Sequence, residues 1–143
     1  MNNWFQCKVK YERNGDDGSI TKVSESYLID ALSFTEAEER INEEMKPFIS
    51  GDFLVSDIKR ARISELFENE NGDKWYRCKV NFISLDEEKG VEKRVASTMY
   101  AQASTLKEAV EVVEKGMQGT LADYEIASVV ETNVMDVFKY NAE

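Results

Sequence analysis

Apolar and polar residues alternate along two stretches of the chain that are similar in sequence, NWFQCKVKY at residues 3–11 and KWYRCKVNF at residues 74–82. The apolar side chains of the first stretch are Phe5, Cys7, Val9 and Tyr11, and those of the second are Tyr76, Cys78, Val80 and Phe82. A period of two is typical of a strand with one buried face. Turn-forming residues follow each stretch, RNGDDG at 13–18 and LDEEKG at 85–90, which predicts two β-hairpins.

An apolar stripe at helical spacing follows each predicted hairpin. SFTEAEERINEEM at 33–45 and TLKEAVEVVEKGM at 105–117 both begin with a hydroxyl residue and carry glutamate three positions later, the spacing of a capping box. The stripes are Phe34, Ala37, Ile41 and Met45 in the first segment and Leu106, Ala109, Val113 and Met117 in the second. We predict one helix in each segment, ended by Pro47 and by Gly119.

A further strand is expected after each helix, beginning with FLVSDI at 53–58 and YEIASV at 124–129. The alternation changes phase within both segments, between Val55 and Ile58 in the first and at the matching place in the second. Such a phase change predicts a β-bulge or a bend.

The order strand, strand, helix, strand thus occurs twice, and we interpret it as an internal duplication with repeats at about 3–68 and 74–139. Matching residues lie 71 or 72 positions apart, and the single-residue differences fall in predicted turns. The expected fold class is α+β, with an antiparallel-rich, three-stranded sheet and one helix per repeat. Neither repeat is large enough to be stable alone, so we expect one pseudo-twofold domain spanning 1–143.

Several segments resemble a known family. WFQCKVKY, YLIDALSFTEAE, DIKRA and GTLADYEIASVVETNVMDVF are similar to those of uncharacterised domains, of unknown function, from Bacteroides-type gut bacteria and their phages. The resemblance spans nearly the whole chain. The resemblance implies a cytoplasmic protein of bacterial or mobile-element origin. It supplies no catalytic residue.

Composition restricts the chemistry. The chain of 143 residues has no histidine, which removes Ser-His and Cys-His nucleophiles and every histidine-ligated metal site. Two cysteines, Cys7 and Cys78, are too few for a tetrathiolate zinc site, and we expect reduced, packed thiols. Catalysis would have to use carboxylates, lysine or tyrosine, and our expectation is no enzymatic activity, no cofactor and no metal.

Charge and hydropathy point to the compartment and to the kind of partner. A net charge of -10 argues against a broadly basic surface that binds duplex nucleic acid. No apolar run approaches the roughly 18 residues that a membrane helix needs, and the start MNNWFQCK is polar. The expectation is a cytoplasmic protein without a membrane partner.

The polar side of the two first strands carries the candidate binding residues. Trp4 and Trp75 occupy equivalent positions beside cationic side chains, and KRAR at 59–62 adds charge. The candidate surface comprises Trp4, Lys8, Lys10, Trp75, Arg77, Lys79, Lys59, Arg60 and Arg62. An aromatic platform beside cations is how proteins hold single-stranded nucleic acid. Alternatively, both tryptophans cover the second face of the sheet or a partner interface, with the cations at its rim.

Three functional hypotheses follow. The leading one is a non-enzymatic binding or adaptor protein whose partner is another protein or a second copy of the chain, giving a homo-oligomer. The second is a single-stranded nucleic-acid binding protein that uses the candidate surface. The third is a metal-dependent nuclease at Asp57 and Lys59 with Asp30 as a further acid, because an acid-x-Lys pair on a strand is one component of such sites.

Overall fold

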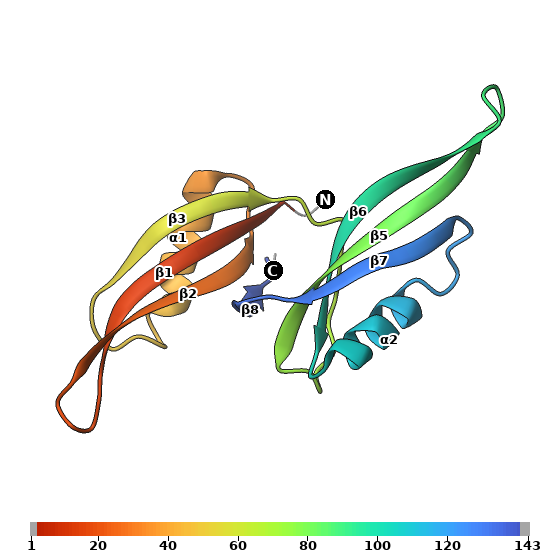
Figure 1. Ribbon diagram of the computed structural model, residues 1–143. Coiled ribbons are helices and arrows are strands. Elements are labelled where there is room, and N and C mark those ends of the chain that lie inside the picture. The colour runs from red at the N-terminus through yellow and green to blue at the C-terminus, as the bar shows by residue number, and fades with distance from the viewer. Residues whose placement is uncertain (1–2, 141–143) are drawn as a thin grey trace. The chain divides into compact units, whose positions relative to one another are not determined.

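A computed structural model describes residues 3–140 of the chain, and the fold is α+β as expected (Figure 1). The first half forms β1 (Trp4–Asn14), β2 (Ile20–Asp30), α1 (Phe34–Met45), β3 (Phe53–Ala61) and β4 (Glu65–Phe67). The second half forms β5 (Lys74–Asp86), β6 (Val91–Ala103), α2 (Leu106–Gly116), β7 (Asp123–Glu131) and β8 (Val134–Phe138).

The chain divides into two compact units. Unit 2 is the continuous segment Ile63–Thr132, and unit 1 consists of the chain up to Arg62 together with the chain from Asn133 onward. The boundaries fall just before β4 and just before β8, so the last strand of each sequence repeat belongs to the other unit.

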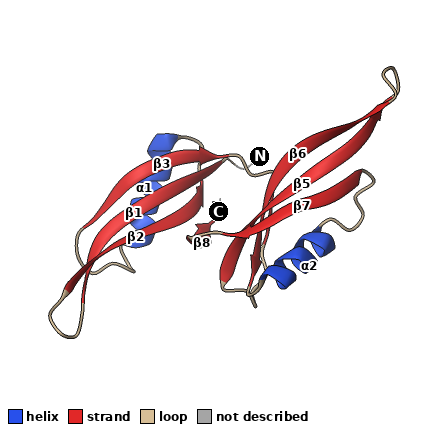
Figure 2. Cartoon of the chain, viewed as in Figure 1, coloured by secondary structure: helices blue, strands red, loops and turns tan. Residues whose placement is uncertain are grey.

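The sheet of unit 1 has four strands in the order β3-β1-β2-β8 (Figure 2). β1 pairs antiparallel with β2, from Trp4 opposite Asp30 to Asn14 opposite Ile20, and antiparallel with β3 on its other side. β8 pairs parallel with the outer edge of β2.

The sheet of unit 2 repeats this arrangement in the order β4-β6-β5-β7. β5 pairs antiparallel with β6 and with β7, and β4 pairs parallel with β6. The expectation of three-stranded sheets is therefore wrong, because each sheet gains a parallel strand from the other repeat. The shared order of elements supports internal duplication, which stays an inference from the sequence.

One helix covers one face of each sheet (Figure 2). Of the predicted stripes, three residues of each are buried in the core, whereas Phe34 and Leu106 are 52% and 55% exposed. The core of unit 1 consists of Phe5, Cys7, Val9, Tyr27, Ile29, Ala31, Ala37, Ile41 and Met45. The core of unit 2 consists of Tyr76, Cys78, Val80, Met99, Ala101, Ala103, Ala109, Val113 and Met117. The cysteines occupy equivalent places because each lies on the helix side of its first strand.

The predicted capping residues and bulges are both present. Ser33 Oγ accepts a hydrogen bond from the backbone N–H of Glu36 at 3.1 Å, and Thr105 does the same for Glu108. The register of β1 with β3 shifts so that Ser56 is the additional residue, and the register of β5 with β7 shifts in the same way at Ala127. Neither helix of the described residues is long and apolar enough to cross a membrane.

Candidate functional site

The cations predicted on β1 lie on the sheet face of unit 1 opposite α1, which we call the open face. Lys8 and Lys10 are exposed on this face, and they alternate along β1 with core residues that point to the helix side. Lys8 is opposite Asp57 on β3 and Ser26 on β2. β1 therefore presents two lysines to solvent on one side of the sheet.

The KRAR segment is divided between the two faces. Lys59 is opposite Gln6 on the open face, and its Nζ lies 3.7 Å from Asp57 Oδ2. Arg60 is opposite Phe5 on the helix side, where its guanidinium carbon lies 6.0 Å from the centre of the Phe5 ring. Arg62 lies beyond the end of β3. In unit 1 the structure thus brings Lys8, Lys10 and Lys59 to one face and separates Arg60 from them.

The two tryptophans are buried. Trp4 and Trp75 are each only 4% exposed, although both alternate with the helix-side core residues of their strands. They belong to neither helix-side core. Neither ring presents an open stacking surface, so the aromatic part of the predicted candidate surface is not accessible to a nucleic-acid base.

The predicted cations of unit 2, Arg77 and Lys79, are exposed on β5. Arg77 is opposite Tyr100 on β6. Burial raises the pKa of Tyr100, and the positive charge and hydrogen bond of Arg77 oppose that rise. Arg77 is therefore already engaged with a buried phenol of its own sheet.

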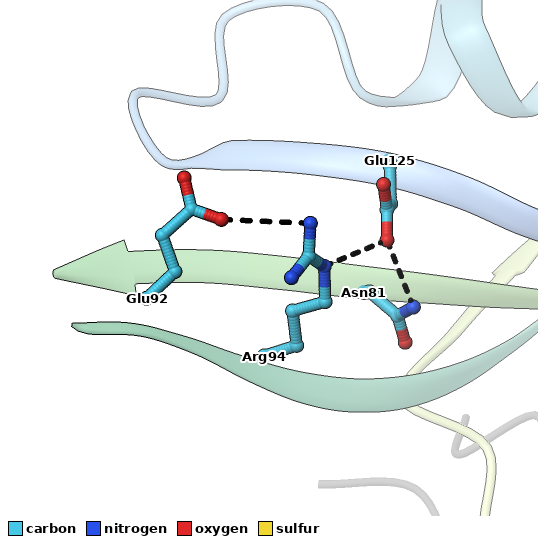
Figure 3. Close-up of polar contacts among 4 residues, drawn as sticks. All are labelled: Asn81, Glu92, Arg94 and Glu125. Atoms are coloured by element: carbon cyan, nitrogen blue, oxygen red, sulfur yellow. Dashed lines mark hydrogen bonds and ion pairs between the residues drawn. The ribbon is translucent and has the colours of Figure 1, made fainter.

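Other charges on the same face of unit 2 are paired with one another (Figure 3). Glu125 Oε1 accepts hydrogen bonds from Asn81 Nδ2 at 3.2 Å and from Arg94 Nε at 3.0 Å. These two bonds lower the pKa of Glu125. Arg94 Nη2 also lies 3.5 Å from Glu92 Oε2. The network joins β5, β6 and β7 and uses its polar groups internally.

Among the described residues, 3–140, no strand pairs with the outer edge of β3. Two depressions adjoin it, with volumes of about 710 Å³ and about 420 Å³. The larger is lined by Lys10, Tyr11, Glu12, Asn14, Lys22, Val23, Ser24 and 51–54. The smaller is lined by Phe34, Thr35 and Glu38 of α1 and by 55–58 of β3. We call the β3 edge and these two depressions the β3 edge site.

The equivalent edge strand of unit 2 differs in charge. β7 contains Asp123, Glu125 and Glu131 and no basic residue. β3 contains one acidic residue, Asp57, and two basic residues. Sequence reasoning singled out the basic residues of β3 but missed the edge site, because an unpaired edge is a property of strand order. The signal that was available is the difference between KRAR and the matching VETN at 130–133.

The residues of the nuclease hypothesis do not converge. Asp57 is level with Lys8 on β1 and Asp30 is level with Trp4, four positions further along the strand. This separation corresponds to about 13 Å along the sheet. Asp30 instead accepts hydrogen bonds from the backbone N–H groups of Asn3 and Tyr140, while burial raises its pKa against the opposing charge of Arg40. Residues 3–140 contain no cluster of three or more acidic or thiol side chains that could hold a metal ion.

Cys7 and Cys78 are free thiols with no exposed surface. Burial, and for Cys7 also the nearby Asp57, raises the pKa of Cys7 to about 12, and burial raises the pKa of Cys78 to about 11. The thiolate is the reactive form of cysteine, so both residues are inert in the folded protein.

We therefore expect a disulfide reagent such as dithionitrobenzoate to modify neither thiol of the native protein at pH 8. Both thiols should react within minutes after unfolding in guanidinium, because their pKa values then return towards about 8.5. Absorbance of the released thiolate measures the reaction. Rapid modification of either cysteine under native conditions would contradict the burial described above.

These features define an α+β protein of two helix-covered sheets that exchange their fourth strands, with a cationic edge strand in one unit. The chain belongs to a family described as a domain of unknown function (DUF4494), which matches residues 3–140. The match confirms that the resemblance noted in the sequence is to an uncharacterised family. No curated protein matches the chain.

Proposed function

We propose that the protein is a non-enzymatic binding protein that captures an extended, acidic protein segment at the β3 edge site. The observation that carries this proposal is the unpaired edge of β3, with one depression between it and α1 and a second at its start that extends across β1 and β2. A segment that adds to a sheet edge gains affinity from main-chain hydrogen bonds and specificity from pockets that receive alternate side chains.

The smaller depression lies on the helix side of such an added strand, and the larger one lies at the start of β3. The smaller one lies between α1 and β3, where the half-buried Val55 and Ile58 offer an apolar surface to side chains pointing towards the helix. The larger one includes Lys10 of β1, which is opposite the 62% exposed Leu54 of β3, and Lys22 of β2. An added strand with alternating apolar and acidic side chains would match both.

Charge favours an acidic partner at β3. On the adjoining open face the four lysines Lys8, Lys10, Lys22 and Lys59 outnumber the two acids Glu12 and Asp57, although Asp57 is paired with Lys59 at 3.7 Å. The chain as a whole carries a net charge of -10. A local cationic strip on an acidic protein selects against its own surface and favours an acidic ligand, and complementary charge also raises the rate of association. The acidic edge of β7 repels the same ligand, so the proposal places the segment on unit 1.

The proposal is tested by selecting random 12-residue peptides on the full-length protein and measuring the dissociation constant of the best binder by fluorescence anisotropy. We expect selected sequences that alternate apolar and acidic residues. Leu54→Glu gives β3 the residue that β7 has at the matching position, Glu125, and is expected to weaken binding at least tenfold. Backbone amides of 53–58 should become protected from hydrogen exchange in the complex.

Val130→Glu is the matched control, because Val130 is an exposed apolar residue of the other edge strand, β7. It is expected to leave the dissociation constant unchanged. Equal weakening by both variants, or protection confined to β7, would place the ligand elsewhere and contradict the proposal.

Single-stranded nucleic acid is the other ligand that the cations suit, and it is distinguished in the same assay. The nucleic-acid hypothesis relied on Trp4 and Trp75 as stacking platforms, and both are buried. Electrostatic contacts alone give affinity that falls steeply with salt. Tight binding of labelled oligo-dT, lost with Lys8→Glu and at moderate salt, would replace the protein segment as the ligand.

We place the protein in the cytoplasm. Two unpaired, buried thiols fit a reducing compartment better than an oxidising one.

A further inference from the structure

The fourth strand of each sheet is donated over a very short connection. Residues 62–64 separate β3 from β4, and residues 132–133 separate β7 from β8. β4 pairs with β6 at Met99, Tyr100 and Ala101, and β8 pairs with β2 at the equivalent Tyr27, Leu28 and Ile29. The two units thus have the same acceptor edge and receive equivalent segments.

A repeat cannot supply its own fourth strand over such a connection. Ala61 at the end of β3 is opposite Trp4 on β1, and Trp4 is opposite Asp30 on β2. The acceptor position at Ser26 is four residues back along β2, about 13 Å, and three strand spacings across the sheet, about 14 Å. The direct path is therefore about 19 Å. Three residues span at most about 11 Å.

The connection between β3 and β4 ends at a residue that is already bonded to the sheet of unit 2. The backbone N–H of Ser64, three residues after Ala61, donates to the carbonyl of Thr98 on β6 at 2.9 Å. The second repeat has the same limit, because Glu131 is level with Ala101 and only 132–133 precede β8. Each four-stranded sheet therefore requires a segment from outside its own repeat.

Unit 1 holds the donated segment through side chains as well as through the strand ladder. The ring of Phe138 stacks on Tyr27 with centroids 5.8 Å apart. Arg40 of α1 donates from Nη2 to the carbonyl of Lys139 at 3.1 Å, and its guanidinium lies 5.3 Å from the ring centre of Tyr140. Asp30 accepts from the backbone N–H of Tyr140. The acceptor is thus a built site for an extended segment, made by β2 and α1.

From these observations we infer that the acceptor edge of unit 1 takes the same segment, residues 133–140, from a second copy of the chain, giving a strand-exchanged dimer. The segment reaches unit 1 from outside its own repeat, over a connection of only two residues. Its contacts with β2 and α1 are therefore the same whether it comes from the same chain or from a second copy. The chain's own segment has the advantage of an effective concentration on the order of millimolar. Exchange between chains follows when the protein is that concentrated or when the chain's own segment is displaced.

A full-length variant with a weakened segment exposes the acceptor. The backbone N–H of Val137 donates to Asp136 Oδ1 at 2.8 Å and so does not face β2. Because neighbouring N–H groups of a strand point to opposite sides, the N–H of Asp136 faces β2. Asp136→Pro removes this ladder donor and loosens the segment. Val137→Pro is the matched control, since proline is tolerated where the N–H faces away from the sheet.

The probe is a fluorescent peptide of residues 133–140, NVMDVFKY, followed by anisotropy. The Asp136→Pro protein is expected to bind it at least tenfold more tightly than the wild-type or the Val137→Pro protein does. A peptide carrying the Asp136→Pro change should not bind. Circular dichroism establishes that the variant is folded, and a folded Asp136→Pro protein that ignores the peptide would overturn the inference.

The wild-type protein provides an independent measurement if Asp136→Pro does not fold. Light and isotopically heavy chains are mixed at millimolar concentration, held near the unfolding midpoint, returned to native conditions and analysed by native mass spectrometry. Mixed-mass dimers that dissociate only slowly on dilution are expected. An exclusively monomeric wild-type protein after this treatment would overturn the inference.

Discussion

Replacing Phe5 with alanine is expected to lower the free energy of unfolding by about 3–5 kcal/mol. Phe5 is 2% exposed and lies in the core of unit 1 between β1 and α1. Its ring meets Phe34 edge to face with centroids 4.9 Å apart, and Arg60 lies over it. The substitution removes the apolar burial, leaves a cavity and deletes an aromatic pair that is worth about 1 kcal/mol in addition.

Urea denaturation followed by fluorescence and circular dichroism measures this loss. Phe48→Ala is the matched control, because Phe48 is the same residue type at 72% exposure in the segment between α1 and β3. Its effect should stay within about 0.5 kcal/mol. Similar losses for the two variants would mean that Phe5 does not contribute to the core as described.

The second large effect is expected at Gly72, in the turn before β5. A Cβ atom at this position would lie 2.5 Å from both the backbone nitrogen and the Cα of Ala103. Backbone atoms of a central strand pair cannot move aside as a flexible side chain does, so Gly72→Ala forces the turn away from β6. We expect a loss near the upper end of the roughly 1–3 kcal/mol that overpacking costs.

Gly51→Ala provides the comparison for this prediction. Nothing lies within 4 Å of a Cβ at Gly51, and its φ is not positive. Alanine there should leave the free energy of unfolding unchanged or raise it by up to about 1 kcal/mol, because it lowers the conformational entropy of the unfolded chain. The same urea titration measures both variants. A Gly72→Ala protein as stable as the wild type would show that the close approach to Ala103 is absent.

Local structure was predictable because short-range patterns determine it. Period-two alternation located β1 and β5, and the capping pairs at Ser33 and Thr105 located the helix starts within one residue. The change of phase near Ser56 identified the bulge, because one additional residue inverts the side-chain pattern.

The fourth strands were not predictable in the same way. A three-residue strand such as β4 has too few alternations to show a period. Their partners are set by strand order and by the length of the connection, which only the assembled sheet reveals. From the sequence, the ending DVFKYNAE at 136–143 was expected to finish the last strand of the repeat, with a docking tail as the alternative, whereas Asp136 to Phe138 lie in a separate strand, β8. Residues 141–143 of that expectation lie outside the described part of the chain.

The candidate surface was predictable only in part. Alternation correctly assigned Lys8 and Lys10 to the side of β1 away from the helix, where they are exposed. It placed Trp4 on the same side but says nothing about whether that part of the face is covered, and Trp4 is buried. Arg60 and Lys59 were grouped by sequence, whereas a strand sends adjacent side chains to opposite faces.

Because of the exchanged strands, the sheets of the two units can be completed at different times during protein synthesis. Unit 2 is a continuous segment that is complete once Thr132 has been added. In unit 1, Ile29 of β2 pairs with Phe138 of β8, which is synthesised 109 positions later. At about 5–20 residues per second this takes roughly 5–20 s, during which the edge of β2 is unpaired on a nascent chain. Neighbouring ribosomes on one message would hold several such edges close together, which is where a segment from another copy has its best opportunity to compete.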